Sequence, residues 1–191
     1  MNAPESAAAD CDAALRLNPG LLGGYGARAE LRMRQGNVVG AHEDLTEIIR
    51  LAPDRANARS LRAAIRIVQR DFTGALDDAN AAIRLEPNNA SNYDLRSAVK
   101  RLLNDNAGAM ADSNRAIQIK PDVASFYVNR GTLRLAQGNS AAAIEDFTKA
   151  IQLEPNNVDA YQNRGRAYAL RGDQANAVAD FDKVLSMGRR T

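Results

Sequence analysis

The sequence lacks most of the side chains from which catalytic and metal sites are built. Cys11 is the one cysteine and His42 the one histidine in 191 residues. One cysteine excludes an internal disulfide, and the two counts together exclude a Cys-based zinc cluster, a Cys–His pair and a Ser–His–Asp triad within one chain. The glycines show no phosphate-loop spacing. We therefore expect no enzyme activity, no cofactor and no metal.

Long apolar runs and an excess of one charge are also missing. No segment approaches the roughly 18 consecutive apolar residues of a membrane helix, and the N-terminus lacks the basic start and apolar run of a signal peptide. The net charge of +2 arises from 25 basic and 23 acidic residues that are interspersed, without a basic stripe. We expect a soluble chain, cytoplasmic as given, that binds neither nucleic acid nor membrane.

Aromatic residues are scarce, at 5%, and tryptophan is absent. What the sequence has instead is a strict period, because prolines recur every 34 residues, each two positions after an apolar residue. These prolines are Pro19, Pro53, Pro87, Pro121 and Pro155. A period of this length indicates one supersecondary unit copied along the chain, in which each copy buries its apolar face against a neighbour. The sequence predicts an all-α fold, a right-handed α-solenoid of antiparallel helix pairs.

The repeat begins at Leu22 and continues without insertion or deletion. Residues 1–21 fit the second half of a repeat, so we expect a half-repeat followed by five pairs, about 11 helices in a single array over 1–191. The five full copies span 22–55, 56–89, 90–123, 124–157 and 158–191. Positions within a copy are numbered from 1 to 34 below.

Each copy carries signals for a helix, a tight turn and a second helix. Position 16 is always Asn or Asp, which favours the start of the second helix. Position 15 is Gly in three copies, Arg70 in the second and Asn104 in the third, and we expect a left-handed conformation there, which Arg70 fits poorly. The residues directly after four of the prolines are predicted to cap the next first helix, namely Asp54, Asn88, Asp122 and Asn156.

Two charged rows run through all five copies. Position 7 is always Arg and position 23 is always Asp, within an otherwise half-apolar interface. We interpret them as a structural ladder of half-buried ion pairs. The sequence leaves open whether each Arg bonds the Asp of its own repeat or of the preceding one. The rows are Arg28, Arg62, Arg96, Arg130, Arg164 and Asp44, Asp78, Asp112, Asp146, Asp180.

The pattern resembles the tetratricopeptide repeat family over essentially the whole chain. The copy with Tyr127 and Gly131, Ala143 and Phe147, and Pro155 matches best. Three departures lie in the second and third copies, where Arg59, Ala79 and Ser113 stand at positions that the family fills with aromatic residues. The resemblance implies a non-enzymatic scaffold that binds a peptide or partner helix in a concave groove.

The resemblance also implies which residues line that groove. Positions 2, 5, 6, 9, 12 and 13 of each first helix form one stripe, which in the second copy is Asn57, Ser60, Leu61, Ala64, Ile67 and Val68. Asn129 and Asn163 occupy position 6, where similar proteins hold the main chain of a bound peptide. An amide offers a donor and an acceptor to an extended backbone. The residues predicted for the site are Asn129, Asn163, Val128, Gln162, Arg166, Asp94, Arg101, Leu95 and Leu135.

Two other functions remain open. The chain is alternatively a regulatory or assembly segment of a larger protein that self-associates through its end helices, as a homo-oligomer. A reader of single-stranded RNA is disfavoured by the 34-residue period and the near-neutral groove. The partner that we expect is a protein or peptide.

Overall fold

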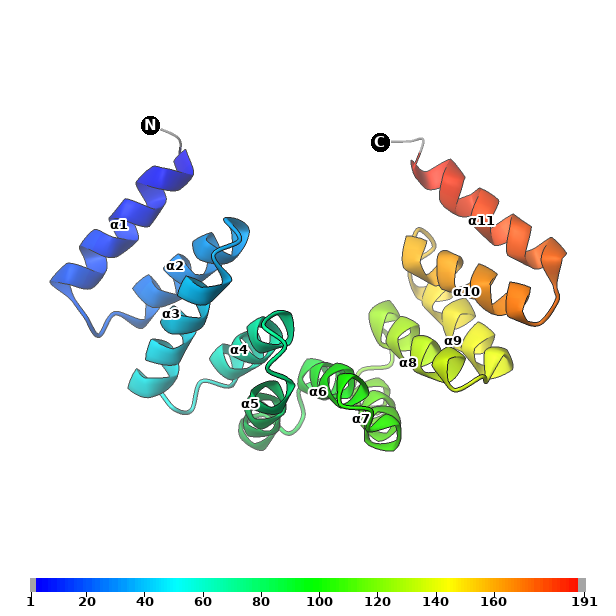
Figure 1. Cartoon of the computed structure of the whole chain (residues 1–191), viewed down its shortest axis with the longest axis horizontal. Helices are drawn as coiled ribbons and strands as arrows, with labels where there is room; N and C mark the ends of the chain where they lie inside the picture. The colour runs from blue at the N-terminus through cyan, green and yellow to red at the C-terminus, as the bar shows by residue number, and fades with distance from the viewer. Residues whose placement is uncertain (1–2, 189–191) are drawn as a thin grey trace. The chain divides into compact units, whose positions relative to one another are not determined.

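The computed structural model describes residues 3–188, and this part of the chain consists of helices joined by short turns, without strands. Figure 1 shows the helices following one another in sequence order. They are α1 (Ala3–Leu17), α2 (Leu22–Arg34), α3 (Val38–Leu51), α4 (Ala56–Val68), α5 (Phe72–Leu85), α6 (Ala90–Leu102), α7 (Asn106–Ile119), α8 (Ala124–Ala136), α9 (Ser140–Leu153), α10 (Val158–Leu170) and α11 (Gln174–Gly188). The all-α prediction and its expected helices are confirmed.

The chain divides into two compact units, Met1–Asn88 and Asn89–Thr191. In the first unit α1 packs on α2, and the pairs α2/α3 and α4/α5 follow. In the second unit the pairs are α6/α7, α8/α9 and α10/α11, with α7 on α8 and α9 on α10. Each unit is therefore a stack of helix pairs, and a single array over 1–191 stays a prediction. None of the described helices has the length and apolar character needed to cross a membrane.

The turns inside the pairs have the predicted conformation. Position 15 has a positive φ in all five repeats, including 61° at Arg70 and 63° at Asn104. Arg70 thus adopts the left-handed conformation despite its Cβ, at a cost of about 1–2 kcal/mol. The caps at position 16 are also as predicted. Each side chain at this position accepts a hydrogen bond from the backbone N–H of the residue three positions later. The accepting residues are Asn37, Asp71, Asp105, Asn139 and Asp173.

The predicted caps directly after the prolines are wrong. Each first helix starts one residue later, so the N-cap residues are Leu21, Arg55, Asn89, Val123 and Asn157. The reason is a turn that the sequence pattern did not resolve. The Arg55 N–H donates to the Ala52 carbonyl at 3.2 Å and closes a turn over Pro53 and Asp54. Asp54, Asn88, Asp122 and Asn156 therefore precede the N-cap.

Residue size in the core is matched between positions 8 and 24. Gly131 on α8 faces Phe147 on α9, and a Cβ added to the glycine would lie 2.6 Å from the ring. Phe147 is fully buried in a cluster with Ala143 and Ala167. Ala79 and Ser113, which replace the aromatic residue in the second and third repeats, also have no exposed surface. The smaller side chains therefore open no water-filled gap.

Candidate functional site

A cavity of about 960 Å³ lies in the first unit between the first helices of the first two repeats. Its walls come from α2 and α4, and buried residues of α3 form part of its floor. The lining residues are Leu22, Gly23, Gly26, Ala29, Glu30, Met33, Leu45, Ile48, Arg55, Asn57, Ala58, Leu61, Ala64, Ile65 and Val68. This cavity is called the α2–α4 groove below.

The groove exists because two positions that face it carry no side chain. A Cβ added at Gly23 or Gly26 would meet no atom within 4 Å. Around this hollow, Met33, Leu61 and Val68 remain 41, 49 and 63% exposed. Apolar side chains left in water around a hollow of this size are typical of a site that buries them against a ligand.

Charged and amide groups are confined to a few points of the lining. Glu30 bonds the exposed Arg34 on its own helix at 2.6 Å, and Arg55 and Asn57 lie at the start of α4. An apolar floor with a few polar groups favours a ligand with an apolar surface that is oriented by polar contacts at its edge.

Four of the six residues of the predicted stripe in the second repeat line this groove, namely Asn57, Leu61, Ala64 and Val68. The nine residues predicted for the site, by contrast, all lie in the third to fifth repeats and outside this groove. The stronger signal was Gly23 and Gly26 at stripe positions 2 and 5, where missing side chains leave room.

The predicted site residues of the second unit are only partly brought together. Asp94, Arg101 and Asn129 line a pocket of about 70 Å³ between α6 and α8. The Asn129 amide Nδ2 donates to both carboxylate oxygens of Asp94, at 3.0 and 2.9 Å. Burial raises the pKa of Asp94, and the hydrogen bond from Asn129 offsets part of this rise. The amide donor of Asn129 is thus already bonded to a residue of the neighbouring repeat.

The other predicted site residues lie outside this pocket. Asn163 donates to the Asp159 carbonyl of its own helix at 2.9 Å. Gln162 and Arg166 are exposed, and Leu95 is half-buried. Val128 and Leu135 are half-buried and pack against the Phe147 cluster. These six residues are spread over α6, α8 and α10, and they do not line the pocket that Asp94 and Asn129 share.

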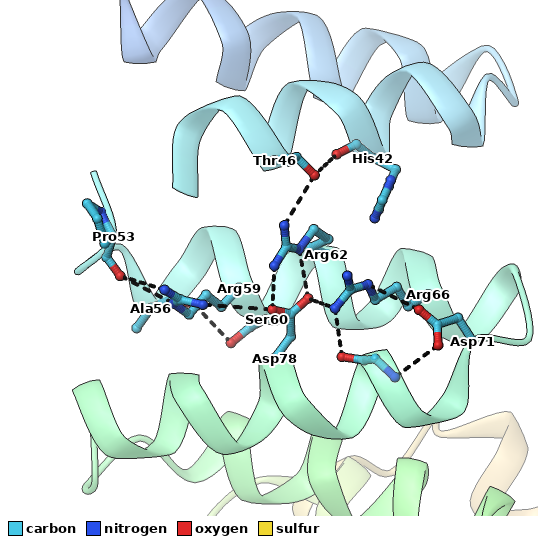
Figure 2. A network of polar contacts seen from close by, with 11 residues as sticks. His42, Thr46, Pro53, Ala56, Arg59, Ser60, Arg62, Arg66, Asp71 and Asp78 are labelled. Carbon is cyan, nitrogen blue, oxygen red and sulfur yellow. Dashed lines mark hydrogen bonds and ion pairs between the residues drawn. The ribbon is translucent and has the colours of Figure 1, made fainter. Parts of the chain in front are cut away.

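Every Arg of position 7 bonds the Asp of its own repeat. The closest Nη2–Oδ1 distances are 2.6–2.8 Å, and the carboxylates are 1–7% exposed. Figure 2 shows Arg62 of α4 reaching Asp78 of α5 in this way. The pairing that the sequence left open is therefore within the repeat. In the third repeat, burial raises the pKa of Asp112. The bonded cations Arg96 and Lys100 lower it by more than burial raises it, so the pKa of Asp112 is below its usual value.

Four of these arginines also bond position 25 of the preceding repeat within the same unit. Arg28 Nη1 bonds Asp12 Oδ1 at 2.6 Å, and Arg62 Nη1 donates to Thr46 Oγ1 at 3.2 Å. In the second unit Arg130 donates to Asn114 at 2.9 Å and Arg164 to Thr148 at 3.1 Å. Each of these four guanidinium groups thus joins three helices of one unit and ties its repeat to the one before it.

A second row of cations at position 11 was missed by the sequence reasoning. Arg32, Arg66 and Lys100 bond Asp44, Asp78 and Asp112 at 2.8 Å, and Arg134 bonds Asp146 at 3.0 Å. The signal was available, because these cations also recur every 34 residues. The fifth repeat has Tyr168 at this position instead.

Arg59 takes over a role that tyrosine plays elsewhere. The hydroxyl groups of Tyr25 and Tyr127 donate to the carbonyls of Pro19 and Pro121, at 3.3 and 2.9 Å. Arg59 donates to the equivalent carbonyl of Pro53 at 3.0 and 3.2 Å. This departure from the aromatic pattern therefore keeps the contact with the turn.

No group of three or more His, Cys, Asp or Glu residues within the described part of the chain is placed to hold a metal ion. Cys11 is a free, half-buried thiol.

Comparisons with solved structures place the fold among helical repeat proteins. A tetratricopeptide repeat protein from Parabacteroides merdae is 21% identical, with a TM-score of 0.82 over 96% of this chain and 73% of that one. MamA from Desulfovibrio magneticus is 20% identical, with a TM-score of 0.74 over 87% and 94%. YrrB, described as a TPR protein with an unusual peptide-binding site, is 19% identical, with a TM-score of 0.66 over 93% and 91%.

No curated protein matches the sequence significantly. The family model described as tetratricopeptide repeat matches residues 27–90 and 128–190, which together cover more than half of the chain. These segments hold four of the five Arg–Asp pairs whose contacts are given above. The chain therefore belongs to the tetratricopeptide repeat family, whose members generally serve as protein-interaction scaffolds.

Proposed function

We propose that the protein is a non-enzymatic interaction module that binds an apolar peptide segment or partner helix in the α2–α4 groove. The observation that carries the proposal is the hollow of about 960 Å³ beside Gly23 and Gly26, rimmed by exposed apolar side chains. Burying the exposed parts of Met33, Leu61 and Val68 would contribute about 25 cal/mol per Å² of apolar surface removed from water. A ligand with an apolar face gains this energy, whereas a fully polar one does not.

The test fills the groove without weakening the fold. Gly26→Leu places a side chain into the open space, and it raises the helix propensity of α2 by about 0.8 kcal/mol. The experiment selects binding peptides from a displayed random library with the full chain, and then measures their affinity by fluorescence anisotropy. We expect Gly26→Leu to weaken binding at least about tenfold, equivalent to about 1.4 kcal/mol, with an unchanged or higher melting temperature.

The matched control adds a leucine elsewhere in the same unit. Thr73→Leu lies on the exposed side of α5 and outside the groove lining. It should leave the affinities unchanged. Equal affinities for the wild type and Gly26→Leu would contradict the proposal.

A second candidate surface consists of the nine residues predicted in the later repeats. The Asp94–Asn129 contact favours it, because a half-buried carboxylate that accepts both bonds from an amide is a preformed polar point on the stripe. Selected peptides whose affinity falls in Asn129→Ala/Asn163→Ala and persists in Gly26→Leu would assign binding to this surface.

A further inference from the structure

One face of the last described helix is apolar and exposed. Val178, Phe181 and Leu185 of α11 are 55, 37 and 61% exposed. The equivalent side chains in other repeats are covered, since Phe147 is fully buried and Ile49 is 9% exposed. The exposure differs because α4 packs on this face of α3 and α10 packs on this face of α9.

The covering helices share one pattern of three contacts. On α10, Ala160 packs in a cluster with Ala150 and Ala167 packs in a cluster with Phe147, both on α9. Between them, Arg164 donates to Thr148 at position 25 of α9. These residues stand at i, i+4 and i+7, so they occupy one side of the helix. The same positions hold Ala58, Arg62 and Ile65 on α4, and Phe126, Arg130 and Leu133 on α8.

Position 25 of α11 is Asp182, which is exposed and has no hydrogen-bond or ion-pair partner among residues 3–188. The half-repeat shows what an aspartate does there, because Asp12 bonds Arg28 of the next helix at 2.6 Å. The α11 face therefore offers the apolar contacts and the anionic acceptor that a covering helix uses.

We propose that this face, made by Val178, Phe181, Asp182 and Leu185, docks a helix of another polypeptide with apolar residues at i and i+7 and an arginine at i+4. The arginine pairs with Asp182, and the apolar residues cover Phe181 and Leu185. This surface is separate from the α2–α4 groove, and a molecule with both sites would connect two partners.

The test uses a helix from this chain as the probe. A peptide with the sequence of residues 123–137 carries Phe126, Arg130 and Leu133 in the required spacing. It is titrated into the ¹⁵N-labelled full chain. We expect saturable amide shifts on α11, and at least about tenfold weaker binding of the peptide with Arg130→Asp.

A charge swap makes the result specific for the Asp182 contact. The chain with Asp182→Arg should bind the Arg130→Asp peptide at least about tenfold better than the wild-type chain does, because the pair is restored with reversed charges. Ala179→Arg is the control, since position 22 is exposed in every repeat. It should leave the binding of both peptides unchanged.

Three results would overturn the proposal. One is the absence of shifts on α11 at peptide concentrations up to about 1 mM. Another is a shift pattern confined to α2 and α4, which would assign the peptide to the groove. The third is a charge swap that restores no binding.

Discussion

Arg164 donates two hydrogen bonds of 2.8 Å to the two carboxylate oxygens of Asp180, which is buried beneath it. Within residues 3–188 no other cation bonds this carboxylate, because Tyr168 replaces the second basic residue of the other repeats. In the fourth repeat Asp146 keeps two cations, Arg130 and Arg134. The two repeats thus differ in how far each depends on its ladder arginine.

Arg164→Ala should therefore destabilise the protein more than Arg130→Ala. Loss of Arg164 leaves a buried carboxylate without a cation, which costs about 3–5 kcal/mol. Loss of Arg130 should cost less, because Arg134 still bonds Asp146 at 3.0 Å. Urea unfolding checks the order, and Arg166→Ala, on the exposed side of α10, should stay within about 0.5 kcal/mol of the wild type. An equal loss in both ladder variants would show that the second cation contributes nothing.

Two buried serines should respond to alanine with opposite signs. The Ser113 hydroxyl is buried and finds no hydrogen-bond partner in the described chain, whereas Ser97 donates to the Ala109 carbonyl at 2.8 Å. Ser113→Ala removes an unsatisfied group and should raise the free energy of unfolding by about 1 kcal/mol, and Ser97→Ala should lower it by a similar amount. Chemical denaturation of both variants measures the difference. A loss of stability in Ser113→Ala would reveal a partner for its hydroxyl.

Two helical glycines should also respond oppositely to alanine. At Gly131 the new Cβ meets the fully buried Phe147, so Gly131→Ala should cost about 1–3 kcal/mol. At Gly26 the space is open, and Gly26→Ala should add about 0.8 kcal/mol through helix propensity. Gly165→Ala falls between them, because its contact, Phe181, is 37% exposed and has room to shift. Melting temperatures that rise in all three variants would exclude the clash at Gly131.

His42 should make the stability of the first unit depend on pH. Figure 2 shows His42 on α3 near Arg62 and Arg66 of α4. Burial, followed by repulsion from Arg66 and then Arg62, lowers its pKa below 6.5, and attraction from Asp78 and Asp71 offsets only part of this. As the pH falls through 6.5, the unfolded chain takes up a proton before the folded one, so stability decreases.

The variant His42→Gln isolates this effect, because the chain has no other histidine. Thermal unfolding of both proteins between about pH 8 and pH 5 should show a smaller acid-side loss in the variant. Parallel pH profiles would mean that the folded environment does not disfavour the imidazolium.

The sequence predicted the fold well because every repeat carries the same turn and helix-cap residues at the same positions. The caps at Asn37 and its equivalents and the turn at Gly36 depend on neighbouring residues in the chain, so spacing is sufficient to place them. The post-proline caps failed because the turn over Pro53 and Asp54 shifted the helix start by one residue. A turn of this kind is set by backbone geometry and not by which side chain is able to cap.

The α2–α4 groove was predicted less well than the fold, because a groove depends on which side chains are missing as much as on those present. Asn129 appeared as a free amide in the sequence, but it bonds Asp94 from the neighbouring repeat. Gly26 carried no evident chemistry, yet it lines the α2–α4 groove, and a Cβ added there would meet no atom within 4 Å. Both observations depend on how neighbouring helices pack, which the sequence pattern does not give.

The sequence by itself determined the helix pairs, their 34-residue repeat and the alternation of Arg and Asp rows, since these follow from local propensities and from the period. Only the tertiary structure decided that each Arg bonds its own Asp, that four of them also bond the preceding repeat of the same unit, and that the hollow lies beside Gly26. The physical reason is that pairing partners and empty space are set by the approach of helices distant in sequence. Side-chain identity limits those contacts, but the packing of whole helices selects among them.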